Sequence, residues 1–433
     1  DPLEVRLLAE RWLLSRSADD AKALSATLHA HPATALEAAA EFGAAGLWQD
    51  GTAVLELATS TAPDKSRISP LVYYYLAHFA EHLGKAAEAA EDYRLARDMS
   101  PDYMFPFQAE AIPVLRQAML ANPTDARAPY YLGNLLFDWQ PDEAVKLWEQ
   151  SAAMDPSFPI VHRNLAIAYS HQAKGNALDK AIASLEKAVA LPNPYPIHFA
   201  ELDELYEAAG APPEKRLAVL EKHADVAARR DDALARAIAL KVVAGQCDEA
   251  IQLMTGRPFA VWEGASLSVA EHWTDAHLLR GHRRLKTGQA QAALTDYQAA
   301  TKIPDNLPSE RRGSGSRSAE TSYWIGTAFE ALGDADNAKK SWQNPAGGRD
   351  GGSRRGADRG LSNRSVEAYY QARALEKLGE KDKAREMFED LVKGIERDYE
   401  LRGLRSARAA KGRMMHLKKA FAGMRALDIT PDR

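Results

Sequence analysis

The chain has 433 residues, of which 46% are hydrophobic and 27% are charged. These values are typical of folded globular proteins and argue against wholesale disorder. The 55 Lys and Arg residues are balanced by 60 Asp and Glu residues, for a formal net charge of −5. The overall charge therefore indicates neither a nucleic-acid-binding protein nor one that binds an anionic membrane surface.

Cysteine content and apolar runs narrow the class of protein further. The single cysteine, Cys247, excludes an intrachain disulfide framework and a thiolate metal cluster, and it fits a reducing compartment such as the cytoplasm. No uninterrupted apolar run approaches the roughly 20 residues of a membrane span, and no signal-peptide pattern is present. The chain starts at Asp1 rather than at a methionine, so we expect a processed protein or a piece of a longer one.

The N-terminal part predicts helical hairpins. Asp1 suits the N-cap of a first helix, and Pro2 suits its first turn. Residues 35–57 predict a further pair of helices that is broken near Gly46. Together these features place N-terminal helical hairpins in residues 1–60.

The first clear repeat lies in residues 73–101. Apolar residues at i, i+3, i+4 and i+7 predict a helix, Gly84 ends it, a second stripe follows, and Pro101 closes the unit. The two stripes are Tyr73, Leu76, Ala77 and Ala80, and then Ala89, Tyr93 and Ala96. Two antiparallel helices in about 34 residues, with small alanines that let them approach closely, are typical of the tetratricopeptide repeat.

Further stretches carry the same spacing. They are residues 130–156, 162–192, 245–254, 287–300, 323–342 and 378–388, with a weaker unit at 201–223. This recurrence predicts an all-α fold, an α/α superhelical solenoid of tetratricopeptide-like helical hairpins, with about ten hairpins in a chain of this length. No run of period-2 alternation is long enough to predict a strand.

The pattern divides the chain into five segments. We expect N-terminal hairpins over 1–60, a repeat array over 61–256, an insertion plus further repeats over 257–343, a Gly/Arg-rich loop over 344–365 and C-terminal repeats over 366–433. The Pro–aromatic stretch 257–265 is the candidate for a non-helical insertion. The Gly/Arg-rich loop has the arginines of a phosphate-tracking segment but no interleaved aromatic residues, so we interpret it as a solvated loop between repeats.

One stretch matches a zinc-peptidase pattern. His78, Glu81 and His82 form H-x-x-E-H, in which two imidazoles at i and i+4 can chelate one metal ion and a glutamate can act as a base. The pattern lies inside the first helix of a repeat, and the sequence offers no identifiable third ligand. We therefore interpret both histidines as groove-surface residues rather than a catalytic zinc site, and we expect no metal and no cofactor.

The concave groove of such a solenoid is the first candidate binding surface. On the repeat template, the first helices turn a set of polar and aromatic residues inward. This set comprises Tyr74, His78, His82, Tyr130, Asn134, Arg163 and His171. Asn134 offers a donor and an acceptor to a peptide backbone, and Arg163 offers a fork suited to a carboxylate. The alternative is that these side chains bond to neighbouring helices.

The insertion is the second candidate surface. Phe259, Trp262 and Glu263 lie beside a glycine, and an exposed tryptophan with a carboxylate can bind a sugar or contact another domain. We favour the alternative of a plug, with Phe259 and Trp262 buried between repeats and Glu263 capping the next helix. Trp273, a few residues later, adds to either surface.

Longer stretches resemble one bacterial group of proteins. They read "PLVYYYLAHFAEHLG", "DYMFP", "NPTDARAPYYLGNLLFD", "DPSFPIVHRNLAIAYSH", "ARRDD", "RPFAVWEG" and "PDNLP", in this order over about residues 35–400. In members of the group, a tetratricopeptide-type region follows an N-terminal β-rich domain of unknown function that is similar to galactose-mutarotase-like domains. The resemblance implies a helical solenoid and a preceding β-domain, but no reaction. The sequence departs from the pattern at Ala265 and after Arg402.

These observations favour a non-catalytic scaffold that binds a protein or peptide segment, or its own N-terminal β-domain, through the concave groove. The alternative is an accessory region of a bacterial carbohydrate-active enzyme that contributes to a sugar-binding site. The aromatic residues discriminate between the two. A solvent-filled cleft lined by Trp139, Trp262 and Trp273 favours carbohydrate as the partner, and burial of these residues between helices favours the scaffold.

Overall fold

The computed structural model describes residues 2–102, 104–172, 176–260, 269–307, 317–347 and 361–401. Within these ranges the chain forms 22 α-helices and one short 3-10 helix, and no strand. The prediction of an all-α fold is confirmed.

Two compact units make up the chain. The first comprises Asp1–Pro212 together with Asp225–Ala227, and the second comprises Pro213–Ala224 together with Ala228–Arg433. The division falls inside residues 61–256, which the sequence pattern treats as one continuous array.

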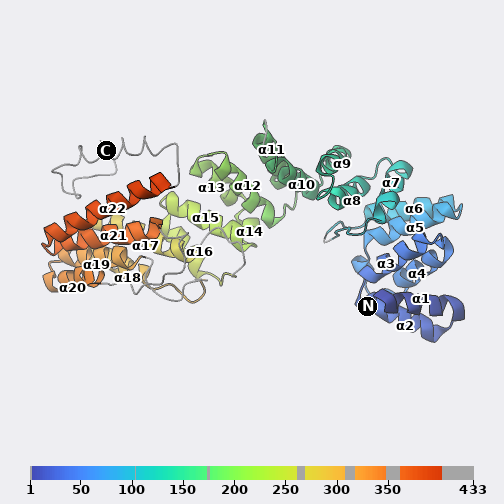
Figure 1. The fold of residues 1–433 in the computed structure, drawn as a ribbon, viewed down its shortest axis with the longest axis horizontal. Coiled ribbons are helices and arrows are strands. Elements are labelled where there is room, and N and C mark those ends of the chain that lie inside the picture. The colour runs from blue at the N-terminus through green and yellow to red at the C-terminus, as the bar shows by residue number, and fades with distance from the viewer. Residues whose placement is uncertain are drawn as a thin grey trace. The chain divides into compact units, whose positions relative to one another are not determined.

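The first unit is a stack of antiparallel helix pairs (Figure 1). Its helices are α1 (Pro2–Ser15), α2 (Ala18–Ala30), α3 (Ala33–Ala44), α4 (Trp48–Ser60), α5 (Pro70–His82), α6 (Ala86–Asp98), α7 (Ala111–Ala121), α8 (Arg127–Leu136), α9 (Pro141–Met154), α10 (Pro159–Ser170), α11 (Ala177–Ala190) and α12 (Pro196–Ala208). The pairs are α1 with α2, α3 with α4, α5 with α6, α8 with α9, and α10 with α11. The unpaired helix α7 packs against both α5 and α8.

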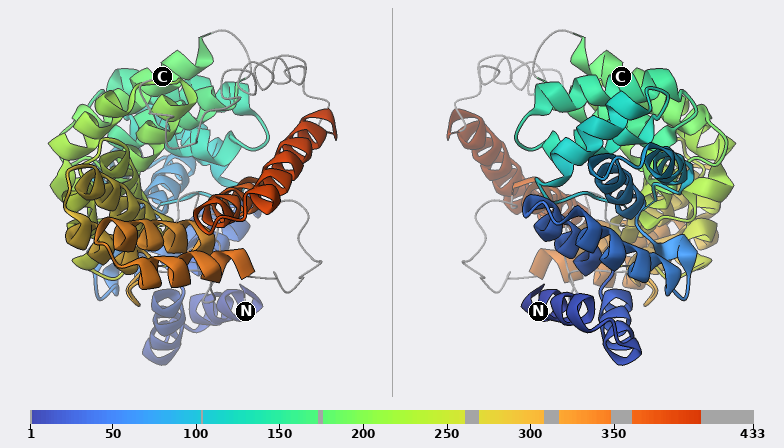
Figure 2. Two further views of the ribbon diagram at one scale, coloured as in Figure 1. Left: turned by 90° about the vertical axis from the view of Figure 1, so that its left-hand side faces the viewer. Right: turned by 90° about the vertical axis from the view of Figure 1, so that its right-hand side faces the viewer.

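The second unit repeats this arrangement. Its helices are α13 (Pro213–Lys222), α15 (Asp231–Val243), α16 (Cys247–Thr255), α17 (Val269–Lys286), α18 (Ala290–Ala300), α19 (Ser318–Ala331), α20 (Ala335–Gly347), α21 (Leu361–Lys377) and α22 (Lys381–Leu401). The short helix α14 (Ala224–Ala227) is divided between the units, with Ala224 in the second and Asp225–Ala227 in the first. From α15 onward, consecutive helices form pairs, and Figure 2 shows the last helix, α22, in red.

Local sequence explains where the helices begin and end, as α5 illustrates. Pro70 occupies its first turn, and the Ser69 hydroxyl accepts a hydrogen bond from the Leu71 amide. At the other end, Gly84 has a φ of +72°, and the amide of Lys85 donates to the Ala80 carbonyl at 2.8 Å. This is a Schellman turn, which requires a left-handed residue that glycine adopts without steric cost. Left-handed glycines also follow α12 at Gly210 and the first helices of later pairs at Gly245, Gly288, Gly333 and Gly379.

Close packing inside a pair depends on a glycine in the first helix and a tryptophan in the second. Gly133 lies under the indole of Trp148, and Gly326 lies under that of Trp342. In both pairs the indole N–H donates at 3.2 Å to the carbonyl oxygen of the residue three positions before the glycine. The predicted alternation of small and bulky residues across the helix pairs is confirmed at these positions.

Candidate functional site

The two histidines of the H-x-x-E-H pattern pack against an aromatic side chain. Trp48, at the start of α4, stacks on His82 with ring centroids 4.0 Å apart and nearly parallel planes. The His78 ring lies edge-on to His82 at 4.7 Å. Burial, and to a lesser extent His82, lowers the pKa of His78 to about 4. Among the described residues, no group of three or more His, Cys, Asp or Glu could hold a metal ion.

Tyr74 does not line a groove, contrary to the expectation from the repeat template. Its side chain is fully buried, and its hydroxyl donates to a carboxylate oxygen of Asp125 at 2.6 Å. The other oxygen of Asp125 accepts the Arg127 amide at the start of α8. Helix α5 is covered by α3, α4, α6 and α7, so the extra helix α7 explains why this position is enclosed.

Tyr130 is also buried, so it is not an accessible groove residue either. It is 2% exposed and packs edge-on against Phe158 with ring centroids 4.8 Å apart. Burial raises the pKa of the Tyr130 hydroxyl, while the nearby Asn134, Arg163 and Arg127 lower it. Tyr130 is therefore a buried packing residue close to the polar groups of Asn134 and Arg163, and it is not itself accessible to a ligand.

Asn134 joins three helices. Its side-chain oxygen accepts hydrogen bonds from the Trp148 indole at 3.1 Å and from the amide of Asn164 at 2.8 Å. The two asparagines lie on α8 and α10, the first helices of successive pairs, and both are partly exposed. The contact to a neighbouring helix, which the sequence left open as an alternative, is present.

Arg163, the residue before Asn164 on α10, forms a separate contact with α12. Its Nε and Nη2 donate to the two carboxylate oxygens of Glu201 at 2.8 and 2.5 Å. The two side chains are 28% and 22% exposed, so the pair is reachable from solvent. We call the partly exposed residues Asn134, Asn164, Arg163 and Glu201 the polar ladder of unit 1.

His171 lies beyond the end of α10. It is exposed, and its ring stacks on Phe137 at a centroid distance of 6.5 Å. Of the seven groove candidates, the structure therefore leaves Asn134 and Arg163 partly exposed, His82 and His171 exposed, and His78 half-buried beside Trp48.

A contact that the sequence did not suggest lies beside the polar ladder. The connection between α6 and α7 contains no helix, and its Asp102 accepts a hydrogen bond from the hydroxyl of Tyr195. Tyr195 is the N-cap residue of α12. The two residues are 93 positions apart, and no local sequence signal relates them.

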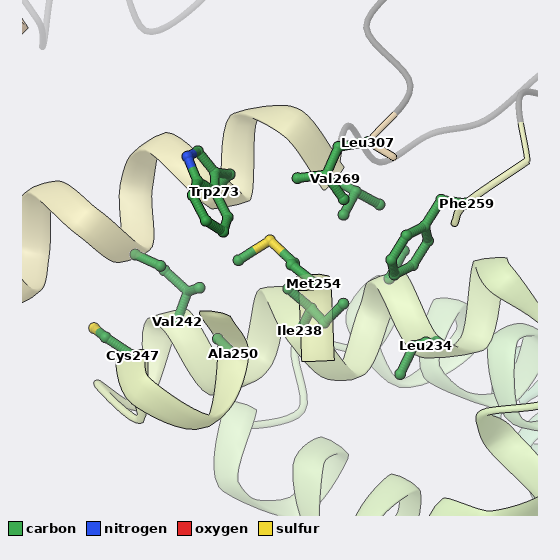
Figure 3. Packing of buried hydrophobic residues seen from close by; sticks show 12 residues of the cluster. Leu234, Ile238, Val242, Cys247, Ala250, Met254, Phe259, Val269, Trp273 and Leu307 are labelled. Atoms are coloured by element: carbon green, nitrogen blue, oxygen red, sulfur yellow. The ribbon is translucent and has the colours of Figure 1, made fainter. Parts of the chain in front are cut away.

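In unit 2, the aromatic residues of the insertion are part of the core. Phe259 and Trp273 are each 7% exposed and belong to one buried cluster with residues of α15 and α16 (Figure 3). The Trp273 indole donates to the Ala299 carbonyl at 3.2 Å. The burial expected of a plug is present for Phe259, and neither side chain presents an exposed aromatic face to solvent. Trp262 and Glu263 lie outside the described residues.

Trp139, another tryptophan of the cleft that carbohydrate binding would require, lies at the surface. It is 85% exposed in the turn between α8 and α9 of unit 1. A cleft that requires the side chain of Trp273 is ruled out by the burial of that side chain. Trp273 therefore does not line a solvent-filled cleft, which is the arrangement that would have favoured carbohydrate binding.

Three of the stretches that carry the sequence resemblance meet in unit 2. Arg257, from "RPFAVWEG", donates to the Ala228 carbonyl at 2.6 Å and to the carboxylate of Asp231, both from "ARRDD". Asn306, from "PDNLP", donates from its amide to the carbonyls of Met254 and Arg257, each at 2.8 Å. These bonds hold the non-helical backbone after α16 in place, which gives the stretches a structural role.

A buried carboxylate in unit 2 also escaped the sequence reasoning. Asp296 on α18 is 1% exposed, and it accepts hydrogen bonds from Arg280 at 2.6 Å and Arg284 at 2.8 Å, with His277 at 3.2 Å. Burial raises the pKa of Asp296, but these donors and charges outweigh burial and leave it lowered. The cluster ties α17 to α18, and only the spacing of basic residues on α17 hinted at it.

Comparisons with known proteins agree with the repeat architecture. A family model described as tetratricopeptide repeat matches residues 368–393, in α21 and α22. The C-terminal hairpin is therefore similar to a tetratricopeptide repeat. The segment matched is short, and the other helix pairs are assigned from their own geometry. The N-terminal mutarotase-like β-domain stays a prediction.

Solved tetratricopeptide-repeat structures match at low identity. YrrB, described as a TPR protein with an unusual peptide-binding site, is 15% identical, covering 53% of this chain and 89% of its own, with a TM-score of 0.24. Yeast Tom70 is 13% identical, covering 96% of both chains, with a TM-score of 0.25. The TPR domain of P58(IPK) is 15% identical, covering 88% of this chain and 98% of its own, with a TM-score of 0.23. The fold assignment rests on the helix pairs and the family match.

None of the described helices is both long enough and apolar enough to cross a bilayer.

Proposed function

We propose that this chain is a non-catalytic scaffold that binds an extended protein segment along the polar ladder of unit 1. The observation that carries the proposal is the ladder itself. Its four side chains come from α8, α10 and α12, and they form two hydrogen-bonded pairs, Asn134 with Asn164 and Arg163 with Glu201, at partly exposed positions. Polar groups that are both ordered and reachable from solvent are the groups that fix the register of a bound backbone.

The ladder retains hydrogen-bonding capacity for a ligand. In the described part of the chain, Arg163 uses Nε and Nη2 for Glu201, which leaves its Nη1 as a donor. Asn164 donates from its amide, which leaves its side-chain oxygen as an acceptor. One donor and one acceptor on neighbouring residues of α10 match the alternating groups of an extended peptide backbone.

The ligand class follows from this chemistry. A protein segment bound through its backbone, with a carboxylate near Arg163, fits the available groups. The sequence resemblance adds one named occupant, the N-terminal β-domain that such proteins carry. Carbohydrate is not proposed as a ligand, because Phe259 and Trp273 are buried.

The test begins with identification of a partner. A photoactivatable cross-linker is placed at the exposed position of His171 in the full chain, which is then used to co-purify a partner from the native organism. The affinity of this partner for the chain is then measured by calorimetric titration. Arg163→Ala and Asn134→Ala should each weaken binding by about 5- to 150-fold, which corresponds to about 1–3 kcal/mol.

Arg116→Ala is the matched control. Arg116 on α7 also forms an ion pair, with Glu143 on α9 at 2.8 Å, and it lies outside the ladder. This variant should bind as the unmodified chain does. Unchanged affinity in both ladder variants, with their helical content intact by circular dichroism, would place the binding site on another surface.

A further inference from the structure

The last helix pair of unit 2 leaves two aromatic side chains uncovered at positions that the preceding pair buries. Counted from the left-handed glycine of each pair, Tyr369 on α21 corresponds to Tyr323 on α19. Phe388 on α22 corresponds in the same way to Trp342 on α20. Tyr323 is 2% exposed and Trp342 is 6% exposed. Tyr369 is 38% exposed, Phe388 is half-buried, and their ring centroids lie 5.8 Å apart. We call these two residues the end patch.

The difference in burial comes from the helix that follows each pair. The buried rings of α19 and α20 share a cluster with Ala374, and Tyr370 packs against it. Both residues lie on α21, the first helix of the next pair. The pair before behaves alike, because Tyr297 on α18 is buried in a cluster with Ala328 of α19. Within the described ranges no helix follows α22, so the end patch lacks the cover that stacked repeats give one another.

The sequence after α22 contains a segment of suitable pattern. We call residues 402–433, which lie outside the described part of the chain, the C-terminal tail. Four of its apolar residues stand at the spacing i, i+3, i+7 and i+10, namely Met414, Leu417, Phe421 and Met424. This spacing predicts one apolar face of an amphipathic helix over residues 413–427.

The connection from α22 is long enough to bring such a helix to the end patch. From Leu401 back to Phe388, the distance along α22 is about 20 Å at the rise of an α-helix. Residues 402–412 reach about 36 Å when extended. A helix over residues 413–427 can therefore run back along α22, as the first helix of a further pair would.

Charge and tethering favour this chain's own tail as the cover. The C-terminal tail carries nine Lys and Arg residues and two Asp residues in a chain of net charge −5, so the rest of the chain is more acidic than the whole. Opposite charges favour association and help to orient it. A segment joined to α22 by a short connection also competes at an effective concentration on the order of millimolar, which favours it over a second copy of the chain.

We propose that residues 413–427 form a helix that docks on the end of unit 2, with its apolar stripe against Tyr369 and Phe388. The tail thereby closes this end of the repeat stack and occupies the surface on which a second copy could otherwise pack. This inference is independent of the proposed function, because the polar ladder belongs to unit 1.

The experiment places a photo-cross-linker in the end patch of the full chain. p-Benzoylphenylalanine replaces Tyr369, and after irradiation the products are separated by mass and mapped by mass spectrometry. The expected product has the mass of one chain and joins position 369 to residues 413–427. The same cross-linker at Leu332, which is 42% exposed at the end of α19, is the matched control and should give no product with the tail.

Two double variants test the apolar stripe. Leu417→Asp with Phe421→Asp should lose the product at position 369, because unpaired carboxylates are not buried against aromatic rings. Ala422→Asp with Ala426→Asp adds the same charge to the other side of the predicted helix and should keep the product. Circular dichroism of each variant confirms that the helices of the repeats persist.

The outcomes decide what covers the end patch. A product found only at the mass of two chains would show that a second copy packs there, and would overturn the proposal. Absence of any product with residues 413–427 would also overturn it. Equal yields of the tail product from positions 369 and 332, or from the two double variants, would show that the tail makes no specific contact with the end patch.

Discussion

The packing of Gly133 under Trp148 predicts that Gly133→Ala destabilises unit 1. A Cβ atom at Gly133 would lie 2.5 Å from the indole Nε1 and 2.6 Å from Cδ1, whereas ordinary contacts begin near 3.4 Å. The indole would have to move by about 1 Å. It is 3% exposed, and its N–H donates to the Tyr130 carbonyl and to Asn134, so the movement also disturbs these hydrogen bonds.

The magnitude follows from three effects. Overpacking a buried site costs about 1–3 kcal/mol, and loss of the buried indole hydrogen bonds costs about 1–2 kcal/mol more. Replacing glycine by alanine inside a helix returns about 1 kcal/mol. The net expectation is a loss of about 1–4 kcal/mol from the free energy of unfolding, which urea titration followed by circular dichroism measures. Hydrogen exchange should locate the loss in α8 and α9.

Gly394→Ala is the matched control. Gly394 lies inside α22, and no heavy atom is within 4 Å of the position of an added Cβ atom. This variant should be more stable by about 0.5–1 kcal/mol, because alanine favours the helix and meets no neighbour. If Gly133→Ala is as stable as the unmodified chain, or gains as much as Gly394→Ala, the argument from close packing is wrong.

Three further predictions concern single side chains. Asn306→Ala should cost about 1–3 kcal/mol and raise hydrogen exchange in residues 257–260, because two backbone carbonyls lose their donor; unchanged exchange there contradicts this role. Burial, with a smaller contribution from a nearby arginine, lowers the pKa of His198 to about 4. Its contribution to stability is therefore present above the ordinary value near 6.5 and lost as pH falls from there toward 4, by about 1–3 kcal/mol. In urea titrations at pH 7 and 4.5, His198→Gln should reduce this loss and the exposed His171→Gln should not; equal losses in all three proteins refute the assignment. Tyr74→Phe should cost about 1–3 kcal/mol by thermal unfolding, because it removes the donor to a buried carboxylate, and an unchanged melting temperature would show that this bond is dispensable.

The sequence by itself determined the helices and their turns. The i, i+3, i+4, i+7 stripes, together with Gly84 and the equivalent glycines, predict helix pairs, and the structure contains pairs in these stretches, such as α5 with α6 and α10 with α11. These signals are local, because hydrogen bonds within a helix and left-handed turns involve residues no more than about six positions apart. Phe259 as a plug was also within reach of the sequence, since a large apolar ring in a non-helical stretch needs a core to pack into.

The tertiary structure alone decided which polar residues face solvent and what they bond to. Tyr74 and Tyr130 occupy plausible groove positions on the repeat template, but the packing of α7 and of Phe158 encloses them. The bond from Arg163 to Glu201 spans 38 positions, and that from Tyr195 to Asp102 spans 93. Such pairs depend on how neighbouring helices are rotated and spaced, and periodicity within one helix does not encode either quantity. The polar ladder is therefore a property of the packed helices of unit 1.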